Sequence, residues 1–252
     1  SDVCSSDLAR AAPDGYTLMV GSQTTQAVAP ALQGARAAYD GGRDFAAITL
    51  VSTSPQLLVV NPTVPVRSVK DLVALARARP GEVTFGASTG ASTHMAAELF
   101  KQHAKVSMLQ VPYKGEGPAI ADVVGGQISL IFSNLPVALP HARSGRLRGI
   151  AVTSAKRVAP APEFPTIAES GLPGFESSTW YGLFGPAALP RDIVTRLAAE
   201  TARGVGTAET REKLEAIGVF VVAMPSEQFT AFLAAELPRW AKVARASGAK
   251  LD

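Results

Sequence analysis

The sequence VTFGASTGASTHMAAELF, residues 83–100, joins a strand pattern to a helix pattern through a loop of small and hydroxyl-bearing residues. The apolar run at 83–85 predicts a buried strand, and apolar residues recur at helical spacing over 95–100. Such a strand–loop–helix unit presents free backbone N–H groups and a positive dipole end to an anion. Small side chains also let a ligand approach the backbone closely. We therefore expect residues 86–93 to form half of a site for a small carboxylate. An ordinary turn between a strand and a helix is the alternative.

The same loop contains GASTG, residues 86–90, which matches the nucleophile elbow of serine hydrolases with Ser88 as the nucleophile. A hydrolase also needs an acid and a histidine that acts as the base. His94 and His103 lie on or beside the helix that follows the loop, which leaves His141, in a predicted turn. A serine hydrolase therefore remains the enzymatic alternative, carried only by this short pattern.

The composition describes a globular chain of 252 residues, 47% apolar and 18% charged, which suits one large or two modest domains. The net charge of +3 comes from scattered lysines and arginines without a basic run, so we expect no nucleic-acid partner. No apolar stretch approaches the length of a membrane span. Nothing in the sequence indicates a cofactor or a metal, and we expect neither.

The first eight residues, SDVCSSDL, have no periodicity and match the translation of TCAGACGTGTGCTCTTCCGATCT, a common sequencing-adapter string. We expect residues 1–8 to be an assembly artefact joined to an N-terminally truncated protein, whose signal peptide lies in the missing part. A disordered natural terminus is the alternative. If the segment is foreign, Cys4 does not belong to the protein.

Strand patterns alternate with helix patterns along the rest of the chain, which predicts an α/β protein with largely parallel sheets. Ser54 and Pro55 separate two predicted strands, 48–52 and 57–60. A second small polar loop, GSQTTQ at residues 21–26, also follows a strand. Since ligands bind beyond the carboxyl ends of strands in such sheets, we expect the two loops to face one cleft.

Several long motifs resemble, in the same order, the Bug family, the substrate-binding receptors of tripartite tricarboxylate transporters. They are AAPDGYTL (11–18), DFAAITLVSTSPQLLVVNP (44–62), THMAAELF (93–100), VPYKGEGPAIADVVGGQI (111–128), SNLPVALPHARSGRLRGIAVTSAKR (133–157), FPTIAESGLPGFE (164–176) and RWAKVARASGAKLD (239–252).

The resemblance implies a periplasmic two-lobed binding protein of the type II kind, each lobe a mostly parallel sheet flanked by helices. Lobe 1 would comprise residues 9–60 and 180–252, without its first strand, loop and helix, and lobe 2 would comprise residues 61–179. The protein would be a monomeric, non-enzymatic receptor that closes around a di- or tricarboxylate, an amino acid or an aromatic carboxylate. Its partners would be the membrane subunits of the transporter; a binding module on a sensor is another possibility.

The resemblance also implies ligand contacts from backbone N–H groups, hydroxyls and ordered water. The residues at matching positions are Ser22, Thr24 and Thr25 in lobe 1, and Ser88, Thr89, Ser92, Thr93, His94, Tyr113 and Asn134 in lobe 2. Tyr113 could instead be a core residue and His94 a surface cap. The chain departs from the family where Ser133 replaces a frequent Asp. The 86–94 loop is one residue shorter than usual, and no Pro-Gly-Gly loop is present.

Overall fold

The computed structural model describes the backbone of residues 2–250 and the side chains of residues 5–250, which divide into two units. Unit 1 contains the chain up to Thr53, residues 180–216 and the chain from Phe220 onward; unit 2 contains residues 54–179 and 217–219. The first division thus precedes Ser54, whereas the sequence suggested Val60, because one strand continues unbroken through this region. No sequence pattern indicated that residues 217–219 belong with unit 2.

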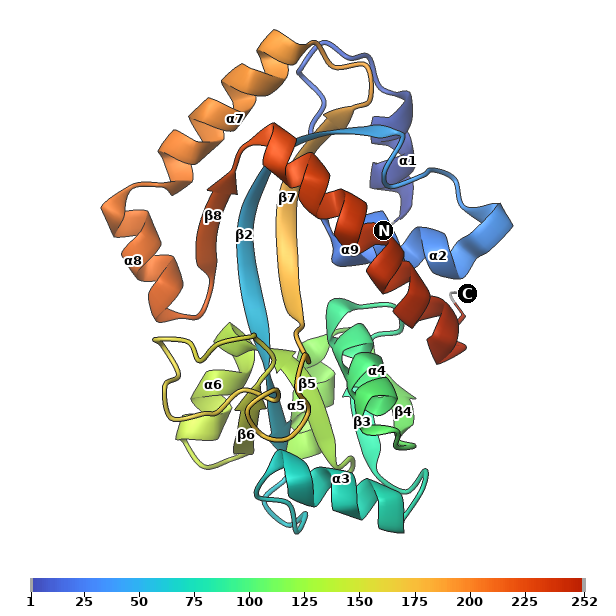
Figure 1. The fold of residues 1–252 in the computed structure, drawn as a ribbon, viewed down its shortest axis with the longest axis vertical. Coiled ribbons are helices and arrows are strands. Elements are labelled where there is room, and N and C mark those ends of the chain that lie inside the picture. The colour runs from blue at the N-terminus through green and yellow to red at the C-terminus, as the bar shows by residue number, and fades with distance from the viewer. Residues whose placement is uncertain (1, 251–252) are drawn as a thin grey trace. The chain divides into compact units, whose positions relative to one another are not determined.

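Unit 1 is built on strands in the order β1-β7-β2-β8, and helices surround them (Figure 1). The strands are β1 (Met19–Ser22), β2 (Phe45–Val60), β7 (Ser178–Pro186) and β8 (Phe220–Met224). The helices are α1 (Asp2–Arg10), the π-helix η1 (Thr24–Val28), α2 (Ala29–Gln33), the 3-10 helix η2 (Gly34–Arg36), α7 (Arg191–Val205), α8 (Ala208–Ala216) and α9 (Ser226–Ser247).

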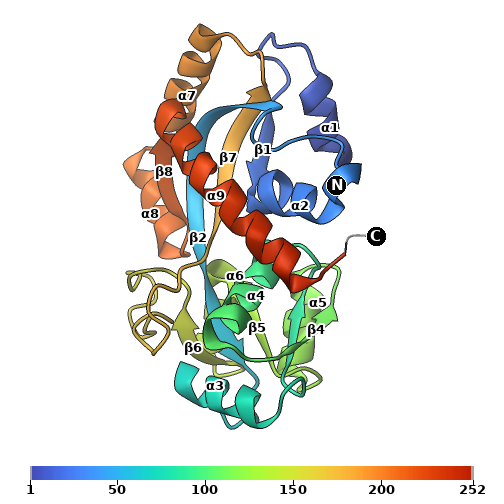
Figure 2. The ribbon, with the colours of Figure 1, turned by 45° about the vertical axis from the view of Figure 1, so that its right-hand side comes forward.

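Aromatic side chains form the core of unit 1. Trp180 and Phe184, from β7, both contact Phe229 of α9, with ring centroids 6.2 and 5.3 Å apart. Gly182 lies under the same ring, where an added Cβ would come within 2.2 Å of Phe229. α9 also packs against η1 and α2 (Figure 2), and it continues through Pro238.

The N-terminal segment that the sequence analysis treated as foreign is helical where it is described. It forms most of α1, and Leu8 is only 2% exposed within the aromatic core of unit 1. The Ser5 hydroxyl donates to the sulfur of Met19 at 3.4 Å. The sequence showed no periodicity in this segment, yet the structure gives it a helix that packs on the core. The foreign origin of residues 1–8 stays a prediction.

Unit 2 contains a sheet with the strand order β6-β2-β5-β3-β4. Its further strands are β3 (Thr84–Ala87), β4 (Leu109–Pro112), β5 (Leu130–Asn134) and β6 (Arg148–Val152). Its helices are α3 (Val69–Ala78), α4 (Ser92–Ala104), α5 (Glu116–Val124) and α6 (Leu135–Arg143). Ser68 caps α3 by accepting the Asp71 N–H, and His141 lies in α6 and not in the turn that the sequence predicted.

The α/β architecture is confirmed, but the expectation of mostly parallel sheets is wrong. β3 runs parallel to β4 and β5, because the intervening helices α4 and α5 return the chain to the same edge. β2 is not part of that series; it pairs antiparallel with β5, β6 and β8, and β1 pairs antiparallel with β7. Pro55 does not interrupt β2, since it lies between the residues paired with β8 and those paired with β5 and β6.

Candidate functional site

The loop between β3 and α4 in unit 2 has the backbone geometry of an anion site. Ala91 precedes the helix in an extended conformation (φ −67°, ψ 160°) and supplies no side-chain acceptor to the helix start. The first N–H groups of a helix have no intrahelical acceptor. α4 contains 13 residues, so its aligned peptide dipoles add positive potential at this end. The N–H groups of Ser92 and Thr93 are therefore the candidate donors to a carboxylate.

Ser88 hydrogen-bonds this loop to the backbone of the segment that follows β4. Its hydroxyl donates to the Tyr113 carbonyl oxygen at 2.8 Å and accepts from the Gly115 N–H at 2.7 Å. Within the described residues no histidine contacts Ser88, so the base that would activate a serine nucleophile is not beside it. The structure therefore gives Ser88 a role in holding the loop and no support for the hydrolase hypothesis.

The hydroxyl groups of Thr89 and Tyr113 also make hydrogen bonds within the protein. The Gln110 amide donates to the Thr89 hydroxyl at 3.2 Å. The Tyr113 hydroxyl donates to Asp122 of α5 at 2.6 Å. Burial, reinforced by that hydrogen bond and by the negative charge of Asp122, raises the pKa of Tyr113 to about 12. The phenol thus joins β4 to α5, and its contact with a ligand stays a prediction.

His94 is neither exposed nor a cap; its side chain is only 1% exposed inside α4. Its Nδ1 accepts the Gly90 N–H at 3.1 Å, so the proton of the neutral ring is on Nε2, which lies 3.6 Å from Glu98. The ring stacks on Phe85 of β3 with centroids 6.1 Å apart. His94 therefore stabilises the loop conformation through its hydrogen bond with Gly90. Gly90 has a left-handed backbone conformation (φ 80°), which glycine adopts readily.

Glu98 makes the stability of this helix depend on pH. Burial raises the pKa of Glu98, but the nearby Nε2–H of His94 and the hydrogen bond from Lys101 at 2.6 Å lower it more, so the net shift is downward. A folded pKa below the unfolded value of about 4.3 adds stability above that pH. This stability is lost as the pH falls through the folded pKa.

Glu98→Gln is therefore expected to lower the free energy of unfolding by about 1–3 kcal/mol at pH 7 and by clearly less near pH 3. Urea unfolding of both proteins at the two pH values measures this. An equal loss at pH 7 and pH 3 would show that the carboxylate charge has no stabilising role.

Asn134 and Ser92 are brought together by Thr179, a residue that the sequence did not single out as a contact. The Thr179 hydroxyl lies 2.8 Å from the Ser92 hydroxyl and donates to Asn134 Oδ1 at 2.8 Å. Glu116, at the start of α5, accepts from Asn134 and from the Ser133 hydroxyl at 2.7 Å. Glu116 follows no recognisable motif, so only the three-dimensional structure could identify it. Its carboxylate lies beside Ser133, the position at which the chain departs from the family pattern.

The predicted residues of unit 1 lie where β1 ends, at Ser22, and where the π-helix η1 begins, at Thr24. The Thr25 hydroxyl accepts the Ser22 N–H at 2.9 Å and donates to the Ser22 carbonyl oxygen at 3.2 Å, while Thr24 is partly exposed. The side-chain amides of Gln23 and Gln26 are buried without a hydrogen-bond partner among the described residues. Because buried amides normally bind protein groups, water or a ligand, these two join the candidates in unit 1.

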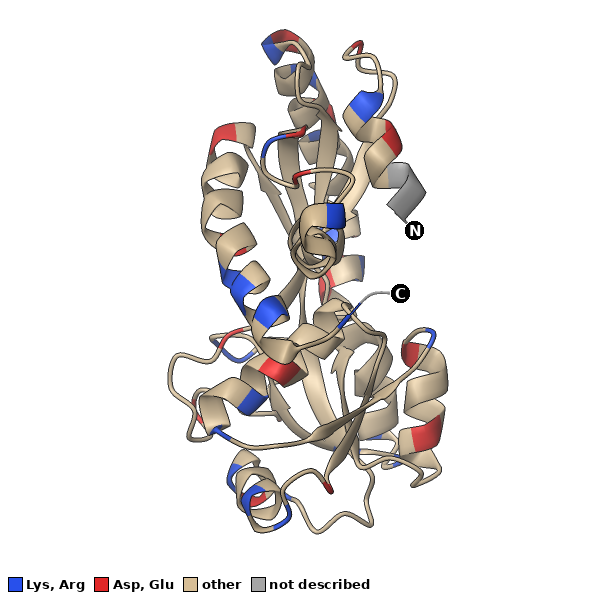
Figure 3. Cartoon of the chain, turned by 90° about the vertical axis from the view of Figure 1, so that its right-hand side faces the viewer, with Lys and Arg blue, Asp and Glu red and all other residues tan. Residues whose placement is uncertain are grey.

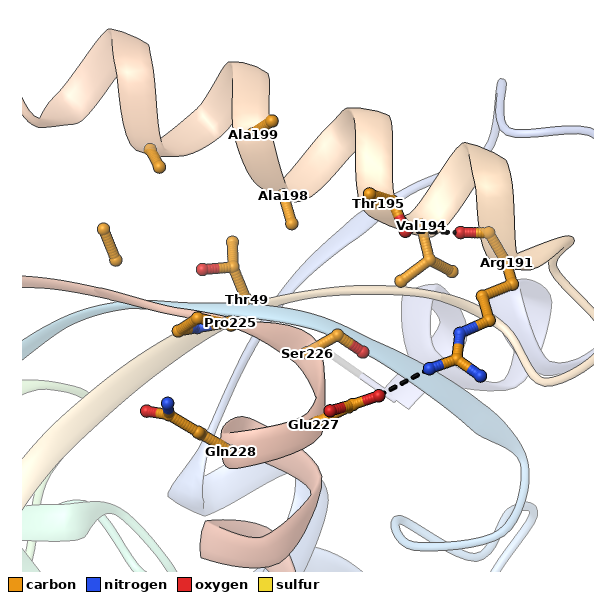
Figure 4. Close-up of a pocket in the computed structure, with 12 residues that line it drawn as sticks. Thr49, Arg191, Val194, Thr195, Ala198, Ala199, Pro225, Ser226, Glu227 and Gln228 are labelled. Carbon is orange, nitrogen blue, oxygen red and sulfur yellow. Dashed lines mark hydrogen bonds and ion pairs between the residues drawn. The ribbon is translucent and has the colours of Figure 1, made fainter.

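A cavity of about 390 Å³ in unit 1 contains none of the ten predicted residues (Figure 4). Ala198 and Ala199 of α7 contribute apolar surface to it. Arg191 and Glu227, at its edge, form an ion pair at 2.5 Å, so the cation already has a carboxylate partner. The cavity is therefore a weaker candidate for carboxylate binding than the β3–α4 loop.

Charged side chains of both signs are interspersed over the fold (Figure 3). In the described part of the chain, no helix is long and apolar enough to cross a membrane. The same residues contain no cluster of His, Cys, Asp and Glu able to hold a metal ion.

The strand order, the flanking helices and the anion-ready loop define an α/β solute-binding protein. Residues 2–249 match the tripartite tricarboxylate transporter family receptor description, and the chain belongs to that family. It is 34% identical to Protein BugT of Bordetella pertussis over 96% of this chain and 75% of the relative.

Two solved structures show the same fold with ligands. The R. palustris protein Rpa4515, solved with adipate, superposes with a TM-score of 0.87 at 36% identity, over 99% of this chain and 83% of that one. MatC of Rhodopseudomonas palustris, with bound malate, superposes with a TM-score of 0.85 at 28% identity, over 96% of this chain and 84% of that one. The family and the fold are thus established independently of the loop geometry.

Proposed function

We propose that this protein captures a small dicarboxylate or related organic acid in the periplasm and delivers it unchanged to the membrane subunits of a tripartite transporter. The uncapped start of α4, behind a loop of small residues, is the observation that carries the proposal. The adipate and malate seen in related structures support the same ligand class. The protein acts as a monomer and catalyses no reaction.

The proposed carboxylate contacts in unit 2 are the N–H groups of Ser92 and Thr93 and the side chains around them. Thr93 is 3% exposed and Ser92 is 7% exposed, so a carboxylate there would be largely removed from water. Charge-assisted hydrogen bonds contribute about 1.5–3 kcal/mol each. Three or four of them give micromolar affinity, about −8 kcal/mol, after part is offset by the ordering of ligand and loop.

Thermal unfolding in the presence of adipate, malate and the neutral diamide of adipic acid tests this proposal. A bound acid at 100 times its dissociation constant stabilises the folded state by about 2.7 kcal/mol, so we expect the Tm to rise by about 5–10 °C. The diamide should leave the Tm unchanged, because it lacks the negative charge. Equal stabilisation by the diamide, or stabilisation by a sugar and by no acid, would refute the carboxylate class.

A further inference from the structure

Glu116 is the end point of a chain of hydrogen bonds in unit 2. Its carboxylate accepts from the Ser133 hydroxyl at 2.7 Å, from the Asn134 N–H at 3.1 Å and from the Asn134 side-chain Nδ2. A carboxylate can only accept, so the NH₂ group of Asn134 must face Glu116. The orientation of the Asn134 amide is thereby fixed, and its Oδ1 faces Thr179.

The orientation of Asn134 fixes the next hydroxyl. Thr179 has one hydroxyl proton, and Asn134 Oδ1, at 2.8 Å, can only accept it. Gln56 Nε2 donates to the same Thr179 oxygen at 2.8 Å. Thr179 therefore has no proton left for any other neighbour.

Ser92 comes last in the chain. Its hydroxyl lies 2.8 Å from that of Thr179, and only Ser92 can be the donor, since the Thr179 proton is committed to Asn134. Only oxygen lone pairs of Ser92 then remain for a ligand at the start of α4. They can accept a hydrogen bond but cannot donate one.

We propose that Glu116 is a positioning residue for ligand specificity: through Asn134 and Thr179 it makes the Ser92 hydroxyl an acceptor. The inference rests on the proposed function, because it places a carboxylate ligand beside Ser92. The site then favours acids that carry a hydroxyl or another donor close to the bound carboxylate over their unsubstituted counterparts.

Glu116→Gln exchanges one carboxylate oxygen for an NH₂ group. This exchange reverses the donor and acceptor roles in the series of hydrogen bonds that leads to Ser92. The remaining side-chain oxygen at this position must accept from the Asn134 N–H, so the new NH₂ group faces the Asn134 side chain. That amide turns over, its NH₂ donates to Thr179, and the Thr179 proton becomes free to bind Ser92. The Ser92 proton can then be donated to a ligand.

Calorimetric titration with malate and succinate measures the specificity. The wild type should bind malate about 10-fold more tightly, as expected for one additional hydrogen bond, and Glu116→Gln should reverse the preference. Ser92→Ala, introduced into the wild type and into Glu116→Gln, should give both proteins the same ratio of malate affinity to succinate affinity. The control is Glu163→Gln, an exposed glutamate of unit 2 paired with Arg143, which should retain the wild-type ratio. An unchanged ratio in Glu116→Gln, or an equal loss for both acids, would overturn the inference.

A ligand-free measurement separates this inference from the proposed function. The chain contains only two asparagines, Asn61 and Asn134, so ¹⁵N-asparagine labelling gives two side-chain NH₂ groups, each seen as a pair of proton signals at one nitrogen shift. Glu116→Gln should move the Asn134 amide proton upfield, because its carboxylate acceptor is lost, and leave Asn61 in place. An unmoved Asn134 signal would refute the proposed series of hydrogen bonds from Glu116 to Ser92, even if both acids bind. If the signal moves but neither acid binds the wild type, the proposed function fails and the specificity claim fails with it.

Discussion

Ser92→Pro is expected to weaken the binding of adipate or malate by about 10- to 100-fold, the effect of removing one charge-assisted hydrogen bond of about 1.5–3 kcal/mol. Proline lacks the backbone N–H that we assign to the carboxylate. It is compatible with the first position of a helix, where that N–H has no intrahelical acceptor. The preceding residue, Ala91, already has the extended conformation that proline requires (φ −67°, ψ 160°).

Ser92→Ala is the matched control, because it also removes the hydroxyl but keeps the N–H group. Titration calorimetry on the two variants isolates the contribution of the backbone, and thermal unfolding should show similar Tm values for them. Equal affinities of Ser92→Pro and Ser92→Ala would mean that the N–H of Ser92 does not bind the ligand.

His94→Phe is expected to lower the free energy of unfolding by about 2–4 kcal/mol. Phenylalanine preserves the ring that stacks on Phe85 but cannot accept the Gly90 N–H, which becomes a buried donor without a partner. It also deprives the buried carboxylate of Glu98 of one neighbour.

His103→Phe, on the same helix, is the control for His94→Phe. His103 is exposed and contacts Phe175 edge-on, so we expect a change below about 1 kcal/mol. Urea unfolding at pH 7 compares the two variants. Equal small losses would show that the hydrogen bond to Gly90 does not stabilise the loop.

Much of the fold could be predicted from local patterns. The strand, loop and helix around residues 83–100 were found because apolar periodicity changes within a few residues. Strand direction was predicted less well, because β2 pairs with strands distant in the sequence and periodicity does not encode partners.

The sequence identified the β3–α4 loop as a candidate site, and that assignment stays a prediction, whereas the contacts of its individual residues could not be predicted. Small and hydroxyl residues marked the β3–α4 loop, yet sequence could not show that Ser88 is bonded to the backbone of residues 113 and 115. Burial of His94 depends on packing against Phe85, and the role of Glu116 depends on its hydrogen bonds with Ser133 and Asn134 at the end of β5. These are properties of the assembled unit and leave no local pattern.

Amide chemical-shift perturbation on the ¹⁵N-labelled protein during titration with adipate tests the carboxylate site most directly. We predict saturable shifts of the Ser92, Thr93 and Gly90 amides in unit 2, with downfield movement of the two helix-start protons as they bind the carboxylate. The amides lining the Arg191 cavity should remain in place. Saturable shifts confined to that cavity, with the start of α4 unmoved, would contradict the assignment of the β3–α4 loop as the carboxylate site.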